Sequence, residues 1–256
     1  MEFPRSGFRV RLSENNIMHR KRFYRSYPEG DGLTFNVKLD TTDLYIKAGV
    51  NLHDEAYRAL SFTRSQLEKH IETHDEFLHS LDPVLPHGDE PDIALAMVRA
   101  SSIAGTGPMA AVAGAIAETV GRELLRYSGE VIVENGGDIW MKLLNPSTVG
   151  LYADNLYFKN QVGIRIYPDD TPCSVCTSSS KLGHSISFGN ADSVTVVAET
   201  GALADAMATA VCNMVKTEND MEKALDFGMS VNGVRGVLIV YRDLLGVRGK
   251  LELVPV

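Results

Sequence analysis

The sequence predicts an α+β fold in which helices cover mixed or antiparallel β-sheets. Short apolar segments bounded by Gly, Pro and Asn are grouped along the chain, and runs of helical periodicity lie beside them rather than alternating with them. A regular strand–helix alternation would instead indicate a doubly wound parallel sheet. With 256 residues, 44% of them hydrophobic, the chain can bury a large core and is not typical of disordered or coiled-coil proteins. We expect one domain over residues 1–256, or two tightly packed lobes.

The charge balance argues against nucleic acid or an anionic membrane as a partner. The chain has 33 acidic and 25 basic residues, a net charge of −8, and no long block of Lys and Arg. Its three cysteines are an odd number, and its first residues contain no apolar stretch typical of a signal peptide. The longest uncharged run, residues 100–117, is weakly apolar and is interrupted by Pro108, which does not suit a membrane span. We therefore expect a cytoplasmic protein with no membrane segment.

The first half of the chain predicts a hairpin followed by three helices. Residues 1–30 are polar and are expected to be irregular, whereas the alternation from residue 32 to residue 48, with a turn signal at Thr41-Thr42, predicts the hairpin. Helical spacing of apolar residues predicts the first helix, and the third is rich in Ala and Gly and should pack closely. The predicted helices span residues 52–78, residue 91 to the break at 105–107, and residues 109–127.

The second half predicts strands interrupted by two helices, over residues 202–216 and 221–229. Gly, Pro and Asn separate the strands, and the β-branched run before the first helix is typical of a buried strand. The predicted strands are residues 130–134, 138–144, 149–152, 162–167, 173–178, 193–198, 236–242 and 249–256.

The helix over residues 202–216 carries one polar stripe. Asp205, Thr209 and Asn213 follow at intervals of four, so they share a face of a helix made mainly of Ala, Met, Leu, Val and Cys. Such a helix should be largely buried, and a buried carboxylate needs a partner. Carboxylate and hydroxyl oxygens suit Mg²⁺. The alternative, which the spacing alone favours, is a hydrogen bond from a neighbouring backbone amide to Asp205.

The segment Asn135-Gly136-Gly137-Asp138 lies between two predicted strands. Asn-Gly and Gly-Gly accept positive φ, so a hairpin turn is the favoured interpretation. The functional alternative is that the two glycines let a ligand approach the backbone while Glu134 and Asp138 face it.

Three further motifs carry weaker signals. Cys173 and Cys176 lie three apart in a strand and should point to opposite faces, so we expect neither a disulfide nor a zinc site between them. His70 and His74 have a spacing compatible with metal binding but lie among charged residues, and we favour a solvated face. The glycines of residues 105–107 could cradle a phosphate, although a simple loop before a helix is favoured.

Several motifs, taken in order, resemble those of the ApbE-like flavin transferases. Residues 135–139 resemble their Gly-Gly-Asp signature, and residues 204–210 are similar to their metal-binding Ala-Asp-Ala-Leu-Ala-Thr-Ala helix. Thr177-Ser178 and His184 resemble their Thr-Ser-Gly and downstream His segments. A closer resemblance, to a smaller branch called uncharacterised protein family 0280, extends over most of the chain. It rests on residues 42–44, 107–117, 133–138 and 183–189.

The resemblance implies an ApbE-like fold and a pocket for FAD or a related nucleotide together with Mg²⁺. Asp205 and Thr209 would be the metal ligands, and the implied chemistry is transfer of FMN onto a protein acceptor through a phosphoester. By matching position, the pocket residues would be Asn135, Gly136, Gly137, Asp138, Thr177, Ser178 and His184.

The chain also departs from the transferase pattern. The transferases' His-x-x-Asp-Pro-x-Thr-Gly segment is here residues 184–190, which lack both the Asp-Pro and the Thr-Gly, and Ala113 stands where they have Lys. These departures leave open a second hypothesis. The protein would then be a non-catalytic ligand-binding or accessory protein, with a sulfur-pathway enzyme as partner, in the assimilation of sulfide and homocysteine with which relatives in anaerobes are associated.

Overall fold

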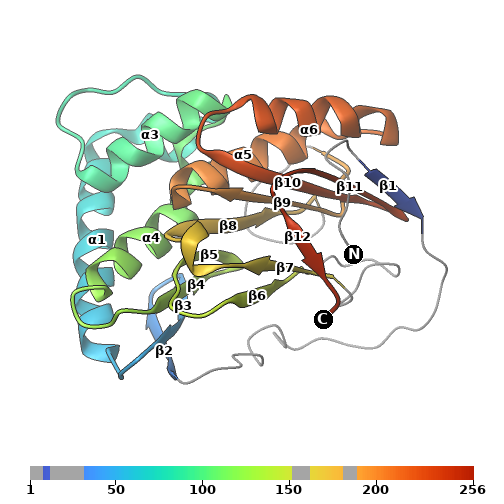
Figure 1. The fold of residues 1–256 in the computed structure, drawn as a ribbon. Coiled ribbons are helices and arrows are strands. Elements are labelled where there is room, and N and C mark those ends of the chain that lie inside the picture. Colours follow the sequence, from blue (N-terminus) through green and yellow to red (C-terminus); the bar gives the residue numbers. More distant parts are fainter. Residues whose placement is uncertain (1–7, 12–31, 152–161, 181–188) are drawn as a thin grey trace.

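The computed structural model describes residues 8–11, 32–151, 162–180 and 189–256, and it confirms the α+β prediction (Figure 1). The helices are α1 (His53–Thr73), α2 (Asp75–His79), α3 (Asp92–Ala104), α4 (Val112–Leu124), α5 (Gly201–Met214) and α6 (Met221–Ser230), with 3₁₀ turns η2 (Pro108–Ala111), η3 (Pro168–Asp170) and η4 (Glu218–Asp220). The strands are β1 (Phe8–Arg11), β2 (Leu33–Leu39), β3 (Thr42–Ala48), β4 (Val131–Asn135), β5 (Asp138–Lys142), β6 (Ser147–Gly150), β7 (Gly163–Ile166), β8 (Cys173–Ser178), β9 (Ser193–Ala198), β10 (Val234–Tyr241), β11 (Leu244–Gly249) and β12 (Glu252–Val254).

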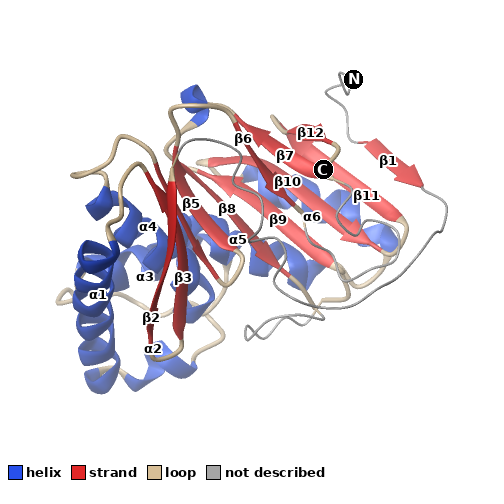
Figure 2. Ribbon diagram, turned by 90° about the horizontal axis from the view of Figure 1, so that it is seen from below, coloured by secondary structure: helices blue, strands red, loops and turns tan. Residues whose placement is uncertain are grey.

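In the described part of the chain, nine strands form one sheet and three form another. The large sheet has the order β1-β11-β10-β9-β8-β5-β4-β3-β2, and the small sheet has the order β12-β7-β6. Each pair of neighbouring strands is antiparallel. Helices cover one face of the large sheet, and the small sheet lies over part of the other face (Figures 1 and 2).

The large sheet therefore separates two hydrophobic cores. Strand alternation in β8 shows the division, since Cys176 packs in the core under the helices and Cys173 packs in the core under the small sheet. The expectation that these two thiols face opposite sides is confirmed, and all three cysteines, each in a described segment, are buried free thiols.

Small residues bring α4 close to both α5 and the sheet. A Cβ on Gly114 would overlap the carbonyl oxygen of Gly201 at the start of α5, and a Cβ on Gly201 would overlap the carbonyl oxygen of Gly114. One face of Gly121 lies against the ring of Trp140, which is fully buried in β5. The Ala/Gly-rich composition of this segment is therefore used for close packing, although the helix begins as the 3₁₀ turn η2.

The predicted first helix is in fact two helices. His74 has φ −134° and ψ 75°, which ends α1 and starts α2. The interpretation of His70 and His74 as part of a solvated face is wrong for His70, which is only 5% exposed.

The motif at residues 105–107 joins α3 to η2 rather than forming a phosphate cradle. The amides of Gly105 and Thr106 both donate to the carbonyl oxygen of Ser101, and Gly105 has a left-handed φ of 72°. A Cβ on Gly107 would overlap the carbonyl oxygen of Ser80.

No single helix in the described residues has both the length and the apolar composition of a membrane span. Among these residues, only α3 and the segment Pro108–Leu124 together have the length and apolar composition of a span, and the chain bends by 103° between them.

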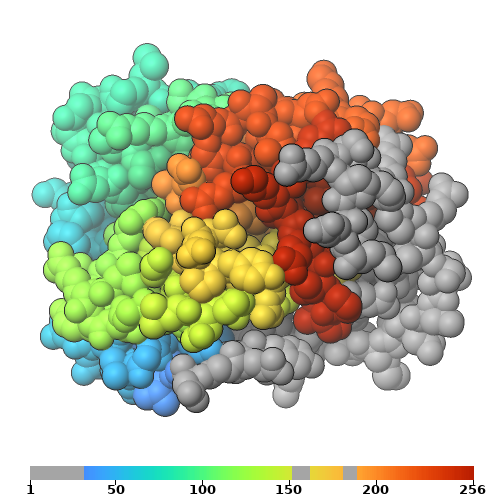
Figure 3. All heavy atoms as spheres, viewed as in Figure 1, coloured from blue at the N-terminus to red at the C-terminus, as the bar shows by residue number. Residues whose placement is uncertain are grey.

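The two ends of the chain differ from the prediction. Within the expected irregular segment 1–30, Phe8–Arg11 forms β1, which pairs with β11. The strand expected over residues 249–256 is present only as the shorter β12, and the prediction missed β11, which a tight turn at Arg242, with φ 54°, pairs with β10. Gly249 then redirects the chain into β12, whose residues lie beside the β7 segment in the space-filling view (Figure 3).

Candidate functional site

Polar groups from four elements meet near the first residue of β5. The Asp138 carboxylate Oδ1 accepts a hydrogen bond from the backbone N–H of Thr177 in β8, at 3.0 Å. The Asp205 carboxylate Oδ2, from α5, accepts one from the backbone N–H of Gly114 in α4, at 2.9 Å. The Cys176 thiol is close enough to interact with both carboxylates, and it donates to the carbonyl oxygen of Gly201 at 3.8 Å. The amide partner that the spacing favoured for Asp205 is therefore present, on a helix distant in sequence.

The protein environment disfavours the ionised form of both the Asp138 and the Asp205 carboxyl groups. Burial, together with the nearby charge of Glu134, raises the pKa of Asp138 to about 7. Asp205 is only partly buried as a residue, but protein surrounds its carboxyl group. Burial and the charge of Asp138 raise the pKa of Asp205 well above its ordinary value. Two such carboxylates are stable side by side only if one holds a proton or if a cation lies between them.

The predicted hairpin turn connects β4 to β5. Asn135 pairs with Asp138, and both central residues have positive φ, 67° at Gly136 and 110° at Gly137, as a two-residue turn requires. The Glu134 carboxylate accepts a hydrogen bond from the N–H of Gly137 at 2.7 Å. No described atom lies within 4 Å of a Cβ placed on either glycine, so none of the described residues covers this side of the turn.

The side chain of Asn135 connects the turn to α4. Its amide Nδ2 donates to the carbonyl oxygen of Ala113 at 3.1 Å, next to the residue whose N–H binds Asp205. The turn, the end of β8, the start of α4 and α5 therefore form one connected arrangement. We call this arrangement the turn site, and it consists of Asn135, Gly136, Gly137, Asp138, Cys176, Thr177 and Asp205.

The other predicted site residues, apart from His184, lie near turn-site residues on the same strand or helix. Ser178 follows Cys176 by two residues and shares its face of the sheet, and its buried Oγ has no hydrogen-bond partner among the described residues. The Thr177 hydroxyl is 2.8 Å from the hydroxyl of Thr195. Thr209 is 5% exposed and lies one turn after Asp205 on α5. His184 falls in residues 181–188, outside the described residues.

Sequence reasoning missed two contributions to the turn site. The spacing of Cys176 draws attention to Cys173, but strand alternation places Cys176 on the same face as Ser178. The other contribution is the backbone of Ala113 and Gly114, for which sequence spacing gives no direct signal. The α4 helix is fixed there by a second contact, in which the Glu118 carboxylate accepts from the N–H of Gly201 at 2.6 Å.

The fold is that of an ApbE flavin transferase. Over 85% of this chain and 94% of the other, the structure is similar to the crystal structure of apo flavinyl transferase ApbE from Pseudomonas stutzeri, with a TM-score of 0.56 and 13% identity. An identity this low establishes the shared fold alone.

Sequence comparison then gives the family. Residues 25–243 match a family model described as "AbpE bacteria". A UPF0280 protein of Methanocaldococcus jannaschii is 41% identical over 197 residues, which cover 75% of this chain and 80% of the relative. Another, from Methanopyrus kandleri, is 36% identical over 224 residues, which cover 85% and 90%. The chain belongs to the UPF0280 family, a branch of the ApbE-like superfamily, as the motifs indicated.

Proposed function

We propose that the turn site binds FAD or a related nucleotide together with Mg²⁺ and transfers the FMN part to an acceptor. One observation carries this proposal: Asp138 and Asp205 are two buried carboxylates close enough for the charge of one to raise the pKa of the other. A divalent cation would remove that repulsion and would attract the pyrophosphate of a nucleotide. The name of the Pseudomonas stutzeri relative, a flavinyl transferase, supports the same class of ligand.

The groups present fit Mg²⁺, which prefers oxygen ligands and keeps several waters. Asp205 and Thr209 would hold the ion, and Asp138 would face it from β5. When bound, the ion supplies positive charge that neutralises the pyrophosphate of the ligand.

The protein's own groups would position the nucleotide. No described residue covers Gly136 and Gly137, which would give the nucleotide access to the backbone. The Ser178 hydroxyl, which has no partner among the described residues, could donate a hydrogen bond to it. We include Thr177 and His184 in the pocket on the motif resemblance. In the transfer itself, the pyrophosphate bond of FAD breaks, the FMN phosphate joins an acceptor hydroxyl, and AMP and the hydroxyl proton are released.

The first prediction is that metal and nucleotide bind together. Titrating the protein with FAD should show tighter binding with Mg²⁺ than without it, and FAD should tighten Mg²⁺ binding by the same factor, since the coupling is reciprocal. Asp205→Ala should abolish the coupling, and Asp169→Ala, which changes an exposed aspartate in η3, should leave it intact. In the parent protein, Mg²⁺ at about 100 times its dissociation constant should stabilise the fold by roughly 2.7 kcal/mol.

The same titrations decide how much of the proposal stands. If FAD, FMN and ATP all fail to bind at concentrations up to about 1 mM, with and without Mg²⁺, the nucleotide pocket is wrong. If FAD binds but neither AMP nor FMN-labelled peptide forms with threonine-containing acceptor peptides, the transfer step is wrong and the pocket stands.

A second candidate function is binding without turnover. Residues 184–190 lack the Asp-Pro and Thr-Gly of the transferases, which favours a ligand-binding or accessory role beside a sulfur-pathway enzyme. Retention of Asp205 and Thr209 favours transfer, because both are the residue types that a metal-dependent transferase needs at these positions.

A further inference from the structure

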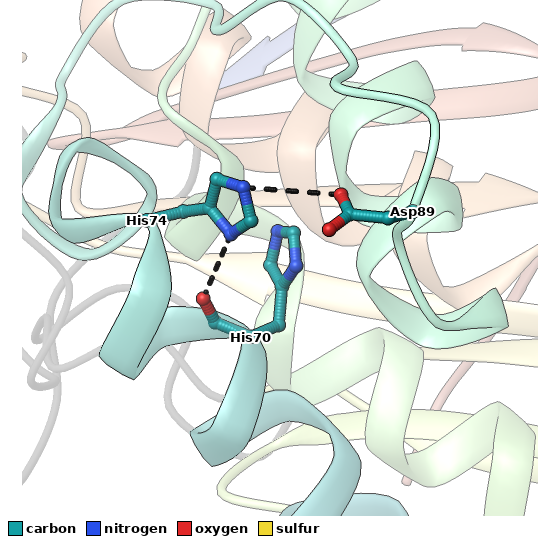
Figure 4. A group of neighbouring side chains, drawn as sticks. All are labelled: His70, His74 and Asp89. Carbon is teal, nitrogen blue, oxygen red and sulfur yellow. Dashed lines mark hydrogen bonds and ion pairs between the residues drawn. The ribbon is translucent and has the colours of Figure 1, made fainter.

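A cluster of imidazole and carboxylate groups lies where the end of α1 meets the loop before α3 (Figure 4). His70 and His74 come from the end of α1, and Asp89 comes from the loop of residues 80–91. One possible ligand atom from each residue lies within 4.8 Å of those from the other two. The cluster shares no residue with the turn site, and its donors are mainly nitrogen rather than oxygen.

His70 brings a buried nitrogen that no described group satisfies. Its side chain stacks on the ring of His74, with centroids 4.3 Å apart, and meets the edge of Phe77 at 5.0 Å. The residue is 5% exposed, and its Nε2 has no hydrogen-bond partner among the described residues. A buried polar atom without a partner destabilises the folded state, so a ligand that binds this nitrogen would stabilise the fold.

His74 is held in an orientation that suits a metal ligand. Its Nδ1 lies 3.1 Å from the carbonyl oxygen of His70, and a carbonyl can only accept, so Nδ1 carries the hydrogen. The Thr73 hydroxyl donates to the same carbonyl at 3.0 Å, and its oxygen, 3.0 Å from Nδ1, can accept from that nitrogen as well. In the neutral ring, Nε2 then presents its lone pair. Metal-bound histidines show this arrangement, in which the other ring nitrogen donates to a backbone carbonyl.

The Nε2 lone pair of His74 faces the Asp89 carboxylate. Nε2 and Oδ1 are 3.8 Å apart, which is longer than a hydrogen bond. Two ligands of a tetrahedral ion with bonds of 2.0–2.1 Å lie about 3.3 Å apart, so a small side-chain adjustment would let one ion bind both. For His70 to bind the same ion, its ring would rotate out of the stack on His74, because the lone pairs of stacked rings do not converge.

The loop that carries Asp89 is fixed by contacts that leave its carboxylate free to bind an ion. The Glu90 carboxylate accepts hydrogen bonds from the backbone N–H groups of His87 and Gly88. The His87 ring lies 4.3 Å from that of His74, and its Nε2 is 2.8 Å from the Glu76 carboxylate in α2. The Asp89 side chain is 69% exposed, which gives an ion a route from solvent.

We propose that His70, His74 and Asp89 bind one divalent transition-metal ion, for which Zn²⁺ is the best fit. Two imidazoles and one carboxylate are a ligand set that Zn²⁺ accepts, with water completing its coordination. The ion would fasten the loop of residues 80–91 to the end of α1. The inference is independent of the proposed function, because the ligands, their chemistry and their elements all differ from those of the turn site.

The test uses the full chain, stripped of metal with a chelator and then titrated with Zn²⁺ and, separately, with Co²⁺ as a visible probe. We expect one tight Zn²⁺ per chain and a Co²⁺ absorption band typical of nitrogen ligation. His74→Gln and Asp89→Asn should each weaken Zn²⁺ binding at least tenfold. The matched control, His79→Gln, changes an exposed histidine on α2 that pairs with the exposed Asp75, and it should bind as the parent does.

Asp205→Ala separates the two sites, because it should leave the tight Zn²⁺ and the Co²⁺ band unchanged. Asp89 is exposed, so Asp89→Asn remains informative even if His74→Gln fails to fold. The proposal is wrong if the folded parent binds no tight Zn²⁺, if Asp89→Asn binds it as tightly as His79→Gln, or if Asp205→Ala is the change that removes it. In each case the cluster is only a stacked histidine pair beside an aspartate.

Discussion

At the scale of single residues, the carboxyl group of Asp138 couples stability to pH. Its pKa is raised to about 7 in the folded protein, mainly by burial, whereas an aspartate in the unfolded chain releases its proton near pH 3.9. Between these values the folded state binds more protons than the unfolded state does. The contribution of Asp138 to the free energy of unfolding therefore falls as pH rises from about 4 to about 7.

The second prediction follows for Asp138→Asn. The asparagine keeps an oxygen that can accept from the N–H of Thr177 but cannot ionise, so the free energy of unfolding should decline less between pH 4 and pH 7 than in the parent. The difference should be on the order of a few kcal/mol, since one pKa unit corresponds to about 1.4 kcal/mol. Urea unfolding at several pH values measures it, with Asp169→Asn as the control. Equal slopes in parent and variant would show that Asp138 is not the group responsible.

The third prediction concerns the thiols. Burial raises the pKa of Cys173 to about 11, and burial with the charges of Asp138 and Asp205 raises the pKa of Cys176 well above its usual value. The thiolate is the reactive form, so the folded protein should react very slowly with a disulfide reagent. Without any reductant, unfolding in guanidinium should expose three reactive thiols. A count of one would reveal a disulfide, and rapid labelling of the native state would contradict the burial.

At the scale of elements, the crossing of α4 and α5 sets the geometry of the turn site. Gly114 does two things at this crossing: its N–H binds Asp205, and its missing side chain lets the backbone of Gly201 approach. The position of Asp205 relative to the turn therefore depends on how closely the two helices pack.

The fourth prediction tests that crossing with Gly114→Ala. The added methyl would overlap backbone atoms of Gly201, which cannot move without shifting α5, so we expect a loss of about 1–3 kcal/mol in stability. Gly150→Ala is the control, because no described atom lies within 4 Å of its Cβ and the residue is exposed in β6. Denaturant midpoints compare the two, and similar midpoints would mean that the helices separate easily.

Sequence patterns predicted elements well where a single element's own residues decide its structure. The apolar composition of α5 and the β-branched run of β9 gave those elements nearly their observed bounds. The patterns failed to predict β1, which is a strand because it pairs with the distant β11. They also failed to predict the end of α1, because no residue near His74 is a typical helix breaker. For the site, motif order indicated the turn and Asp205, but the contact of Asp205 with Gly114 is between residues 91 positions apart.

At the scale of the whole molecule, one sheet contributes to both hydrophobic cores. Val175 and Cys176 are neighbours in β8, yet they pack in different cores. Loosening either core would therefore disturb strands that the other requires. We propose on this basis that the chain folds as one domain.

The fifth prediction is a single cooperative unfolding transition. The only tryptophan, Trp140, is buried under the helices, so its fluorescence reports on that core, whereas far-ultraviolet circular dichroism reports on both sheets and all helices. The two signals should follow the same curve in urea. A transition in circular dichroism that precedes the change in fluorescence would indicate a separately unfolding lobe.

The pairing of β12 with β7 also has a consequence for synthesis on the ribosome. Residues 163–166 are made long before residues 252–254, and β7 is the strand between β6 and β12 in the small sheet. While translation continues, β7 and the apolar face that it covers lack their last neighbour. The helix-covered core also needs residues made late, such as Tyr241 and Leu244, so neither core is complete until β10, β11 and β12 have been made. Until then, the apolar faces of both cores are surfaces that a ribosome-associated chaperone would have to shield.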